Sequence, residues 1–403
     1  MRSIVAVTNE IDDVVSAVRE LREQVEEQGP LGAGSVGFVF CDAEMPHDGF
    51  IREMKEKFPF DIVGSTGIAT FDTKNGTQMM SAALLVLTGD DVSFGASLTG
   101  ELSRDNLESE LRSAYERASS SLGGVPEKMM FLIPPFAAAA PLDAYVSILN
   151  RCSGGLPIFG GLPSSSIPDM DIVMFADGGA FMDRAAIVLM GGDVRPLFSV
   201  QNILSTFSQA KHEVTDASEN VVRGVDNMTF IDYLRKSGLS VDELIAQKDL
   251  AVYVSTPLIV NLNVDDADDG VPVVRTIQRL DPSDGSGVLF GSISKHSKVS
   301  LASMKRNDIQ ESAKALVDDI KRKIAEVSGD GYRYSTLFCV SCGGRYMVMA
   351  DDKNLEGDIL LGNLPEGLEL AGFYAYGEVC PTVISGGKAL NRVHNESIVI
   401  CAL

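Results

Sequence analysis

The feature of the sequence that most restricts the fold is a pattern that occurs three times. In each copy an apolar segment runs into a cluster of glycine with serine, threonine or tyrosine, and a second apolar segment returns about twenty to thirty residues later. The segments that open the copies are 35–42, 128–136 and 335–344. Such a degenerate repeat predicts an internally pseudo-symmetric protein built from one kind of α/β unit.

The first copy shows which elements the unit contains. Residues 11–28 carry apolar side chains at helical spacing, with Asp12 and Asp13 in the first turn and Gly29-Pro30 after the last one, which predicts an amphipathic helix. Strands are expected at 35–42, 61–71 and 81–89. The turn Asn75-Gly76 between the last two is a strong hairpin signal.

Between the second and third copies the sequence predicts further strands, one of them over 250–262, and a long amphipathic helix over 307–327. The more polar segment 208–240 is expected to bridge two halves of the chain. We therefore expect a mixed α/β protein of two intimately packed, pseudo-repeated halves, 1–208 and 209–403, each with a mostly antiparallel or mixed sheet flanked by helices.

Composition restricts the partners. With 34 basic and 56 acidic residues the formal charge is −22, and this surface repels phosphate backbones and anionic lipid, so no nucleic acid and no membrane partner is expected. Six cysteines are too few for a disulfide framework, which favours a soluble protein of the cytoplasm. Because there is no tryptophan, a binding site is expected to be a small pocket of backbone groups and a few polar side chains.

Two short motifs suggest chemistry but lack its context. Gly32 to Gly37 matches G-x-G-x-x-G, yet the predicted helix precedes the motif and the strand follows it, the reverse of a dinucleotide site. Cys339 and Cys342 have the spacing of redox and zinc sites, but no second pair lies nearby in the sequence. No cofactor and no metal site is predicted.

Polar, glycine-rich strand ends are the remaining candidate site. Glycines allow a ligand to approach the main chain and leave N–H groups free for an anion. Arg345, just past a strand end, could hold a carboxylate, and Glu378 could pair with an amine. The alternative is that the glycines serve turns and bulges while Arg345 and Glu378 form a structural ion pair.

At the third copy the residues resemble a known family. The runs SCGGR (341–345), LAGFYAYGEVCP (370–381) and HNESIVI (394–400) resemble the C-terminal half of FIST domain proteins, as does VVRTIQRLDP (273–282). IVGSTGIATF and IFGGLPSSS resemble the N-terminal half, although Ser65 stands where a cysteine is common. The resemblance implies a FIST N-terminal domain at 1–208, a FIST C-terminal domain at 209–403, and a sensory module for small ligands such as amino acids.

The strand ends and the resemblance together predict a non-enzymatic sensor that binds an amino acid or similar small polar metabolite. Binding is expected to close the two halves on the ligand. A signalling protein that recognises the bound state is a possible partner. The predicted ligand-binding residues are Arg345, Tyr374, Tyr376, Glu378, Gly160, Gly161, Ser164, Ser165, Ser65, Thr66, Cys342, His394, Asn395 and Arg275. Two alternatives remain open. One is a thiol-dependent enzyme with Cys342 as nucleophile and Cys339 or His394 as its partner, and the other is an adaptor or assembly protein.

Overall fold

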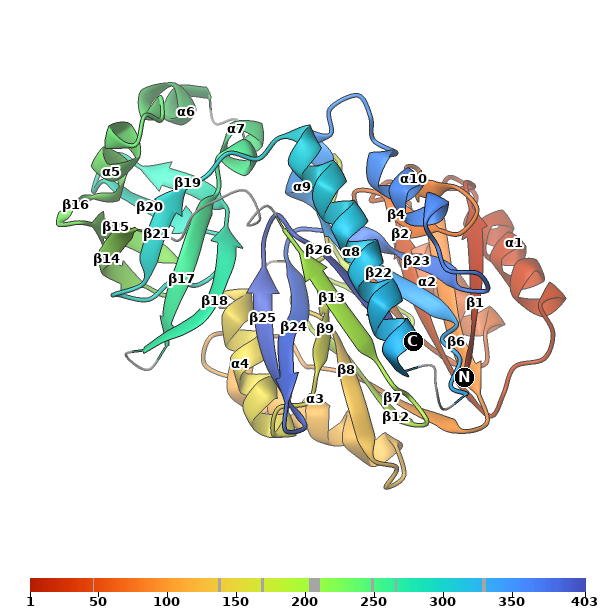
Figure 1. The fold of residues 1–403 in the computed structure, drawn as a ribbon. Helices are drawn as coiled ribbons and strands as arrows, with labels where there is room; N and C mark the ends of the chain where they lie inside the picture. Colours follow the sequence, from red (N-terminus) through yellow and green to blue (C-terminus); the bar gives the residue numbers. More distant parts are fainter. Residues whose placement is uncertain are drawn as a thin grey trace.

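The chain forms a larger body and a smaller lobe, which lie side by side in Figure 1. The computed structural model describes residues 1–45, 47–136, 139–167, 170–202, 211–247, 250–264, 267–327 and 331–403. The lobe is made of residues 211–302 and the body of the residues before and after it.

The body contains three repeats of one unit, in the order strand, helix, strand, helix, strand, hairpin, strand. The first repeat comprises β1 (Arg2–Thr8), α1 (Val14–Glu27), β2 (Gly34–Cys41), α2 (His47–Lys57), β3 (Asp61–Thr66), β4 (Thr70–Asp72), β5 (Gly76–Gln78) and β6 (Ala82–Gly89). The second comprises β7 (Val92–Leu98), α3 (Leu107–Ser121), β8 (Glu127–Ile133), α4 (Leu142–Ser153), β9 (Ile158–Gly161), β10 (Met174–Ala176), β11 (Gly179–Phe181) and β12 (Ala186–Gly192).

The third repeat is interrupted by the lobe and has two helices in place of its second one. It comprises β13 (Leu197–Gln201), α8 (Arg306–Val327), β22 (Thr336–Cys342), α9 (Gly343–Val348), α10 (Leu355–Gly362), β23 (Glu369–Ala375), β24 (Glu378–Ser385), β25 (Lys388–His394) and β26 (Ile398–Ala402).

Each repeat forms a mixed four-stranded sheet with the same pairing. The orders are β1-β6-β2-β3, β7-β12-β8-β9 and β13-β26-β22-β23. In every sheet the last two strands are parallel and the other pairs are antiparallel. The threefold repeat predicted from the sequence is therefore confirmed at the level of strand order.

The hairpin of each repeat joins the sheet of another repeat. β4–β5 extends the sheet of the third repeat next to β23, β10–β11 extends that of the first next to β3, and β24–β25 extends that of the second next to β9. This cyclic exchange ties every repeat to the other two.

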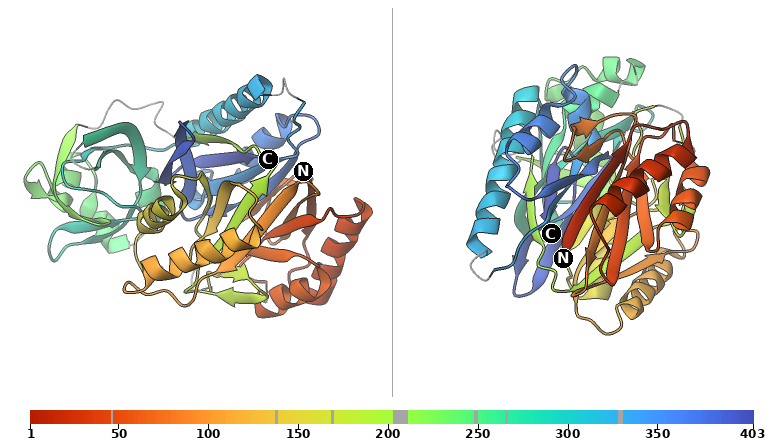
Figure 2. Two further views of the ribbon diagram at one scale, coloured as in Figure 1. Left: turned by 90° about the horizontal axis from the view of Figure 1, so that it is seen from below. Right: turned by 90° about the vertical axis from the view of Figure 1, so that its right-hand side faces the viewer.

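The three sheets enclose one apolar core, and helices cover their outer faces. In the right-hand view of Figure 2, α8 lies on one side of the body, α1 on the opposite side, and α3 and α4 below. The central β2, β8 and β22 are apolar along both faces because one face meets the core and the other meets the helices.

Three phenylalanines at equivalent positions of the repeats meet in this core. Phe38, Phe131 and Phe338 lie with ring centroids 4.8 to 5.3 Å apart. Each stands at the middle of the central strand of its repeat, so the rings mark the pseudo-threefold axis of the body.

A glycine is required beside this axis in each repeat. A Cβ atom on Gly64, Gly160 or Gly372 would lie 1.7, 2.0 and 1.8 Å from a carbonyl oxygen of the neighbouring central strand. Each glycine also pairs across the strand with a residue of the exchanged hairpin. Two backbones therefore approach each other where no side chain fits.

The lobe has a hydrophobic core of its own. It consists of β14 (His212–Ser218), β15 (Val221–Val225), β16 (Met228–Thr229), α5 (Phe230–Lys236), α6 (Val241–Gln247), α7 (Leu250–Ser255), β17 (Leu258–Val264), β18 (Ala267–Arg275), β19 (Ile277–Asp281), β20 (Ser286–Leu289) and β21 (Lys298–Leu301). Its strands form one sheet in the order β18-β17-β21-β14-β15-β20-β19, with β16 beside β15.

The predicted mixed α/β class with mixed sheets flanked by helices is confirmed, and the internal repeat is threefold with an inserted lobe. Two local predictions are wrong. Residues 250–255 are helical, because a short apolar run fits a buried helix as well as a strand. Residues 211–236 do not bridge two halves but form strands and a helix of the lobe. The predicted boundary at 208/209 lies outside the described residues.

Candidate functional site

The predicted glycine-rich clusters of the three repeats meet at one end of the body. Ser164 joins them: its hydroxyl donates to the carbonyl of Tyr374 and accepts from the amide of Ile68 at 3.1 Å, and its own amide donates to the carbonyl of Thr66. These residues come from the second, third and first repeats. The clusters therefore lie together, and their hydrogen bonds join the three repeats to one another; we call these contacts joints.

Most of the predicted polar side chains at this end are engaged in such joints. Thr66 bonds the backbone of Val173, and the Tyr376 hydroxyl donates to the carbonyl of Ser165 at 2.6 Å. Gly160 and Gly161 pair with β24. The Ser65 hydroxyl is buried without a partner.

Next to these joints lies a fully buried acidic group made of Cys342, Glu378 and Glu396. The Glu396 carboxylate accepts a hydrogen bond of 2.6 Å from the Thr276 hydroxyl of the lobe, and its second oxygen has no partner. Glu378 accepts from the amide of Ser397 at 3.3 Å and also keeps one oxygen without a partner. Two buried carboxyl groups with unused acceptors are typical of functional sites and not of packing alone.

Burial shifts the protonation of all three groups. It raises the pKa of Glu396 to about 7 and that of Glu378 well above its usual value, where the neighbouring Glu396 adds to the effect. The pKa of the Cys342 thiol is raised well above its usual value by burial, and then by the two carboxyl groups. The group therefore holds protons at pH values where exposed carboxyl groups have lost theirs.

Gly344 explains part of the SCGGR motif. A Cβ atom there would lie 2.4 Å from a carboxylate oxygen of Glu396, so only glycine leaves room for this side chain. Glu396 itself has a positive φ of 52°, which is strained for a residue other than glycine.

Arg345 is not free to hold a ligand carboxylate in this structure. It is completely buried, and its guanidinium donates twice to Glu356, at 2.8 and 2.6 Å, and to Ser312. The alternative ion pair with Glu378 is also not formed. A contact of 3.5 Å to the carbonyl of Glu396 makes Arg345 a positioning residue beside the acidic group.

The remaining predicted residues connect body and lobe. Arg275, at the end of β18, is buried and forms an ion pair of 3.1 Å with the partly exposed Asp143 of α4; it also donates to the carbonyl of Val393. Asn395 accepts from the amide of Thr276 at 3.4 Å. These contacts, together with the bond from Thr276 to Glu396, hold the lobe against the body.

The geometry does not favour thiol catalysis. A nucleophilic cysteine needs a lowered pKa, and that of Cys342 is raised. His394 bonds the carbonyl of Cys380, and burial lowers its pKa to about 4, so it is neutral at physiological pH. Cys339 is a free, buried thiol whose pKa is also raised by burial.

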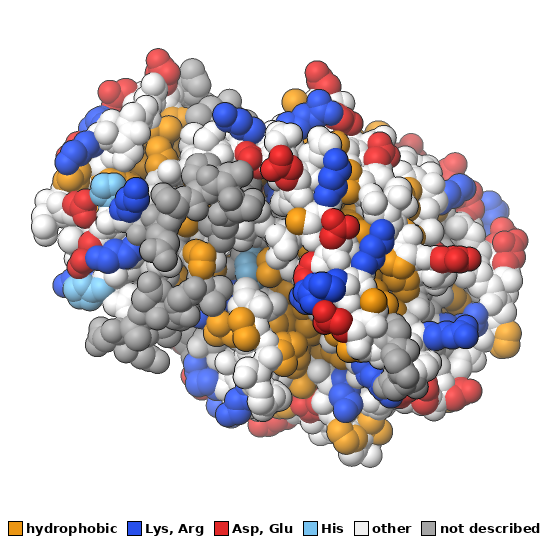
Figure 3. All heavy atoms as spheres, viewed as in Figure 1, with side chains coloured by type: hydrophobic (Ala, Val, Ile, Leu, Met, Phe, Trp, Pro, Cys, Tyr) orange, Lys and Arg blue, Asp and Glu red, His pale blue; other side chains and the backbone are white. Residues whose placement is uncertain are grey.

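A pocket of about 520 Å³ opens between lobe and body. Phe136, Leu142 and Leu162 line it on the body side, and Gln278, Leu289 and Phe290 line it on the lobe side. A Cβ atom on Gly377 would lie 3.2 Å from Leu162 of the pocket wall and 3.8 Å from Asn395. Figure 3 shows a notch between the two parts, with charges of both signs on each.

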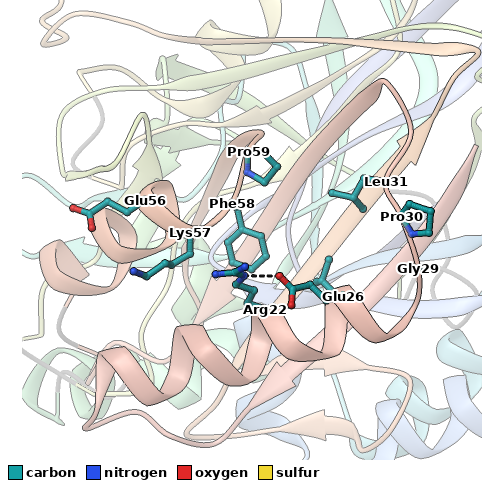
Figure 4. A pocket seen from close by; sticks show the side chains of 10 residues that line it. Arg22, Glu26, Gly29, Pro30, Leu31, Glu56, Lys57, Phe58 and Pro59 are labelled. Atoms are coloured by element: carbon teal, nitrogen blue, oxygen red, sulfur yellow. Dashed lines mark hydrogen bonds and ion pairs between the residues drawn. The ribbon is translucent and has the colours of Figure 1, made fainter.

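A second cavity, of about 590 Å³, lies far from these residues between α1 and α2. In Figure 4, Arg22 pairs with Glu26, with Pro30 and Leu31 on one side and Lys57 on the other. None of the predicted site residues lines this cavity, and none lines the pocket between lobe and body. Across the described ranges, no cluster of acidic, histidine and cysteine side chains suits a metal ion, and no helix is long and apolar enough to cross a membrane.

Family comparison agrees with the layout of the chain. The model of the FIST N domain matches residues 35–228, and that of the FIST C domain matches residues 232–381. The chain belongs to the FIST domain family. FIST domains are associated with sensing in signal transduction.

The other comparisons add nothing to this. No curated protein matches the FIST sequence. Among solved structures, PurLQS from Thermotoga maritima is 9% identical over 99% of this chain and 72% of that chain, with a TM-score of 0.21. PurL from T. maritima complexed with ADP is 11% identical over 99% and 71%, with a TM-score of 0.21. A TM-score this low supports no argument about this FIST protein.

Sequence reasoning missed several residues of the FIST site. Glu396 stood within the run HNESIVI, where a carboxylate two residues before the apolar stretch Ile398 to Ile400 was a usable signal. Asp143, Thr276 and Glu356 gave no such signal, because their partners are distant in the sequence and only the fold brings them together.

Proposed function

We propose that this FIST protein is a sensory protein of the cytoplasm that binds a small polar metabolite, an amino acid or a close relative, in the pocket between lobe and body. The observation that carries the proposal is the position of this pocket. It is bordered by side chains of both the body and the lobe. Its volume is within the range of small-molecule sites.

The lobe provides the means of signalling. It has a core of its own, and it meets the body through polar contacts such as Arg275–Asp143 and Thr276–Glu396. Ile259 and Val274 of the lobe also pack in a hydrophobic cluster with residues of the body. A ligand that touches both parts prefers one arrangement of them and shifts the population toward it. A partner protein that recognises this arrangement would pass the signal on.

The free state of the cysteines supports the proposed cytoplasmic location. All six are free, and five of them are buried. Such thiols suit a reducing environment, which supports the proposed cytoplasmic location.

A thermal-shift screen against amino acids, nucleotides and small carboxylates tests the proposal. A ligand that binds only the folded protein raises the melting temperature with its concentration. Ala140→Phe, which places a ring in the pocket, is expected to abolish the shift, whereas Ala33→Phe at an exposed loop position leaves it unchanged. A flat screen across all classes, or a shift that survives Ala140→Phe, would contradict the proposal.

A further inference from the structure

An ion pair spans the mouth of the pocket between lobe and body. Arg104 of the body donates two parallel hydrogen bonds to Glu219 of the lobe, at 2.6 and 3.0 Å, and both residues line the pocket. The two side chains are largely exposed. One pocket thus has a cationic group on one wall and an anionic group on the other.

Glu219 is held in place by its backbone. It has a positive φ of 55°, and its carbonyl accepts from the amide of Ile293 at 2.8 Å. The next residue, Asn220, exchanges two hydrogen bonds of 2.8 Å with Leu289. A strained turn fixed at both residues presents the carboxylate at the pocket with little loss of entropy on binding.

The pocket is lined by polar residues, among them Tyr145, Asn220 and Gln278, and by a group of apolar ones. Phe136, Leu142 and Leu162 come from the body, and Leu289 and Phe290 come from the lobe. Phe136 is partly exposed although its ring packs against Tyr376 at 5.6 Å. The apolar part of this lining suits an apolar or aromatic group of a ligand.

We propose that Arg104 and Glu219 recognise the carboxylate and the ammonium group of a free α-amino acid with an apolar side chain, which enters the pocket between them. The inference rests on the proposed function and names its ligand class and contacts. Arg104 takes the carboxylate in a bidentate contact, Glu219 takes the ammonium group, and the side chain lies against Leu142, Leu162 and Phe290.

Replacing the Arg104–Glu219 ion pair by contacts with the ligand costs little free energy. An exposed ion pair contributes only about 0–1 kcal/mol, so separating Arg104 from Glu219 costs little, and each charge regains a partner from the ligand. The two charges must move apart to admit the zwitterion. Because one belongs to the body and the other to the lobe, binding at this place changes the position of the lobe.

Calorimetric titration of the full-length protein tests the assignment. The probes are phenylalanine, leucine and glycine, together with phenylalaninamide, which lacks the carboxylate, and 3-phenylpropanoate, which lacks the ammonium group. We expect phenylalanine or leucine to bind and the other three probes to bind at least about tenfold more weakly.

Variants locate the two contacts. Arg104→Gln and Glu219→Gln are each expected to weaken the binding of the amino acid by about tenfold or more. Phenylalaninamide should bind Arg104→Gln with the same affinity as it binds the wild type, because it has no carboxylate for Arg104 to hold. Arg112→Gln, which removes an exposed arginine paired with Glu108 on α3, serves as the matched control and should bind as the wild type.

The outcomes separate the inference from the proposed function. Amino-acid binding that is unchanged in Arg104→Gln and Glu219→Gln overturns the assigned contacts. If a different small molecule binds and Ala140→Phe blocks its binding, the proposed ligand class is wrong and the proposed sensory function stands. If no probe binds and no other small molecule does, the proposed function fails as well.

Discussion

At the scale of single residues, the acidic group of Cys342, Glu378 and Glu396 makes the stability of this protein depend on pH. The pKa of Glu396 rises from its ordinary value of 4.5 to about 7 in the folded chain. Between these values the folded state binds a proton that the unfolded state has released. The stabilising contribution of that proton is complete below about pH 4.5 and is lost as the pH rises through 7.

Glu396→Gln is expected to remove this dependence. Glutamine stays neutral and can still accept the hydrogen bond from Thr276, so the free energy of unfolding should fall less between pH 4.5 and 7, with a difference from the wild type on the order of a few kcal/mol. Urea unfolding across this range measures it. Glu366→Gln, at an exposed turn, is the control. Parallel pH profiles for Glu396→Gln and the wild type would show that folding does not change the pKa of Glu396.

His394 acts in the opposite direction and must be separated from Glu396 in this experiment. Its pKa is lowered to about 4, so its stabilising effect is lost as the pH falls from 6.5 toward 4. The difference between Glu396→Gln and the wild type removes the contribution of His394, because both proteins retain it; it reports Glu396 together with its effect on the neighbouring Glu378.

The residue scale is also where the sequence was least informative. Arg345 and Glu378 were predicted as contacts for a ligand, and both are completely buried. Their partners could not be foreseen, because Glu356 and Ser397 reach them only through the fold. Pattern and composition identify a polar residue that is expensive to bury, but not the group that compensates for it.

At the scale of elements, the glycines beside the axis are the strictest requirement of the repeat. Gly372 has a φ of 152°, and a Cβ atom on it would lie 1.8 Å from the carbonyl oxygen of Cys339. The opposing strand, β22, cannot move away from Gly372, because it also pairs with β26. The exchanged hairpin strand β4 holds β23 from its other edge.

Gly372→Ala is therefore expected to destabilise the protein by about 2–5 kcal/mol, measured by chemical unfolding. Gly362→Ala is the matched control, since nothing lies within 4 Å of a Cβ atom there and the residue ends helix α10. Alanine at that position should be neutral or stabilising by up to about 1 kcal/mol. Equal stability of the two variants would show that the backbones adjust at the axis.

Elements were more predictable than contacts because their signals are local. The helix α1 and the strand β2 lie within a few residues of their predicted bounds, since the apolar spacing and the turn residues are adjacent in the sequence. The helix α7 was mistaken for a strand because so short an apolar run contains too little periodicity. The exchange of hairpins leaves no trace in the local pattern.

At the scale of the whole molecule, three repeats form one body while the lobe keeps a separate core. The sequence predicted the repeat, because each copy encodes the same element order. It did not predict that the lobe interrupts the third copy between β13 and α8. Function is expected at this junction, because it is the place where two separately folded parts share a pocket.

The docking of the lobe depends on Asp143. Its carboxylate pairs with the buried Arg275 at 3.1 Å and accepts from the amide of Ser292 at 2.7 Å. Without it the guanidinium is buried and unpaired, a costly state that the protein relieves by letting water reach Arg275. Loosening of the lobe is therefore expected in Asp143→Ala, while the body stays folded.

Hydrogen exchange measures this difference. In Asp143→Ala the amides of Thr276, Phe290 and Ser292 should exchange at least about tenfold faster than in the wild type, and those of β8 and β22 should remain protected. Asp48→Ala, an aspartate in the first turn of α2, is the matched control and should change neither set. Equal acceleration in β8 and β22 would mean that Asp143 stabilises the body, and unchanged rates at the junction would mean that other contacts hold the lobe. Accelerated exchange confined to the junction would identify the lobe as the part whose position a ligand can control.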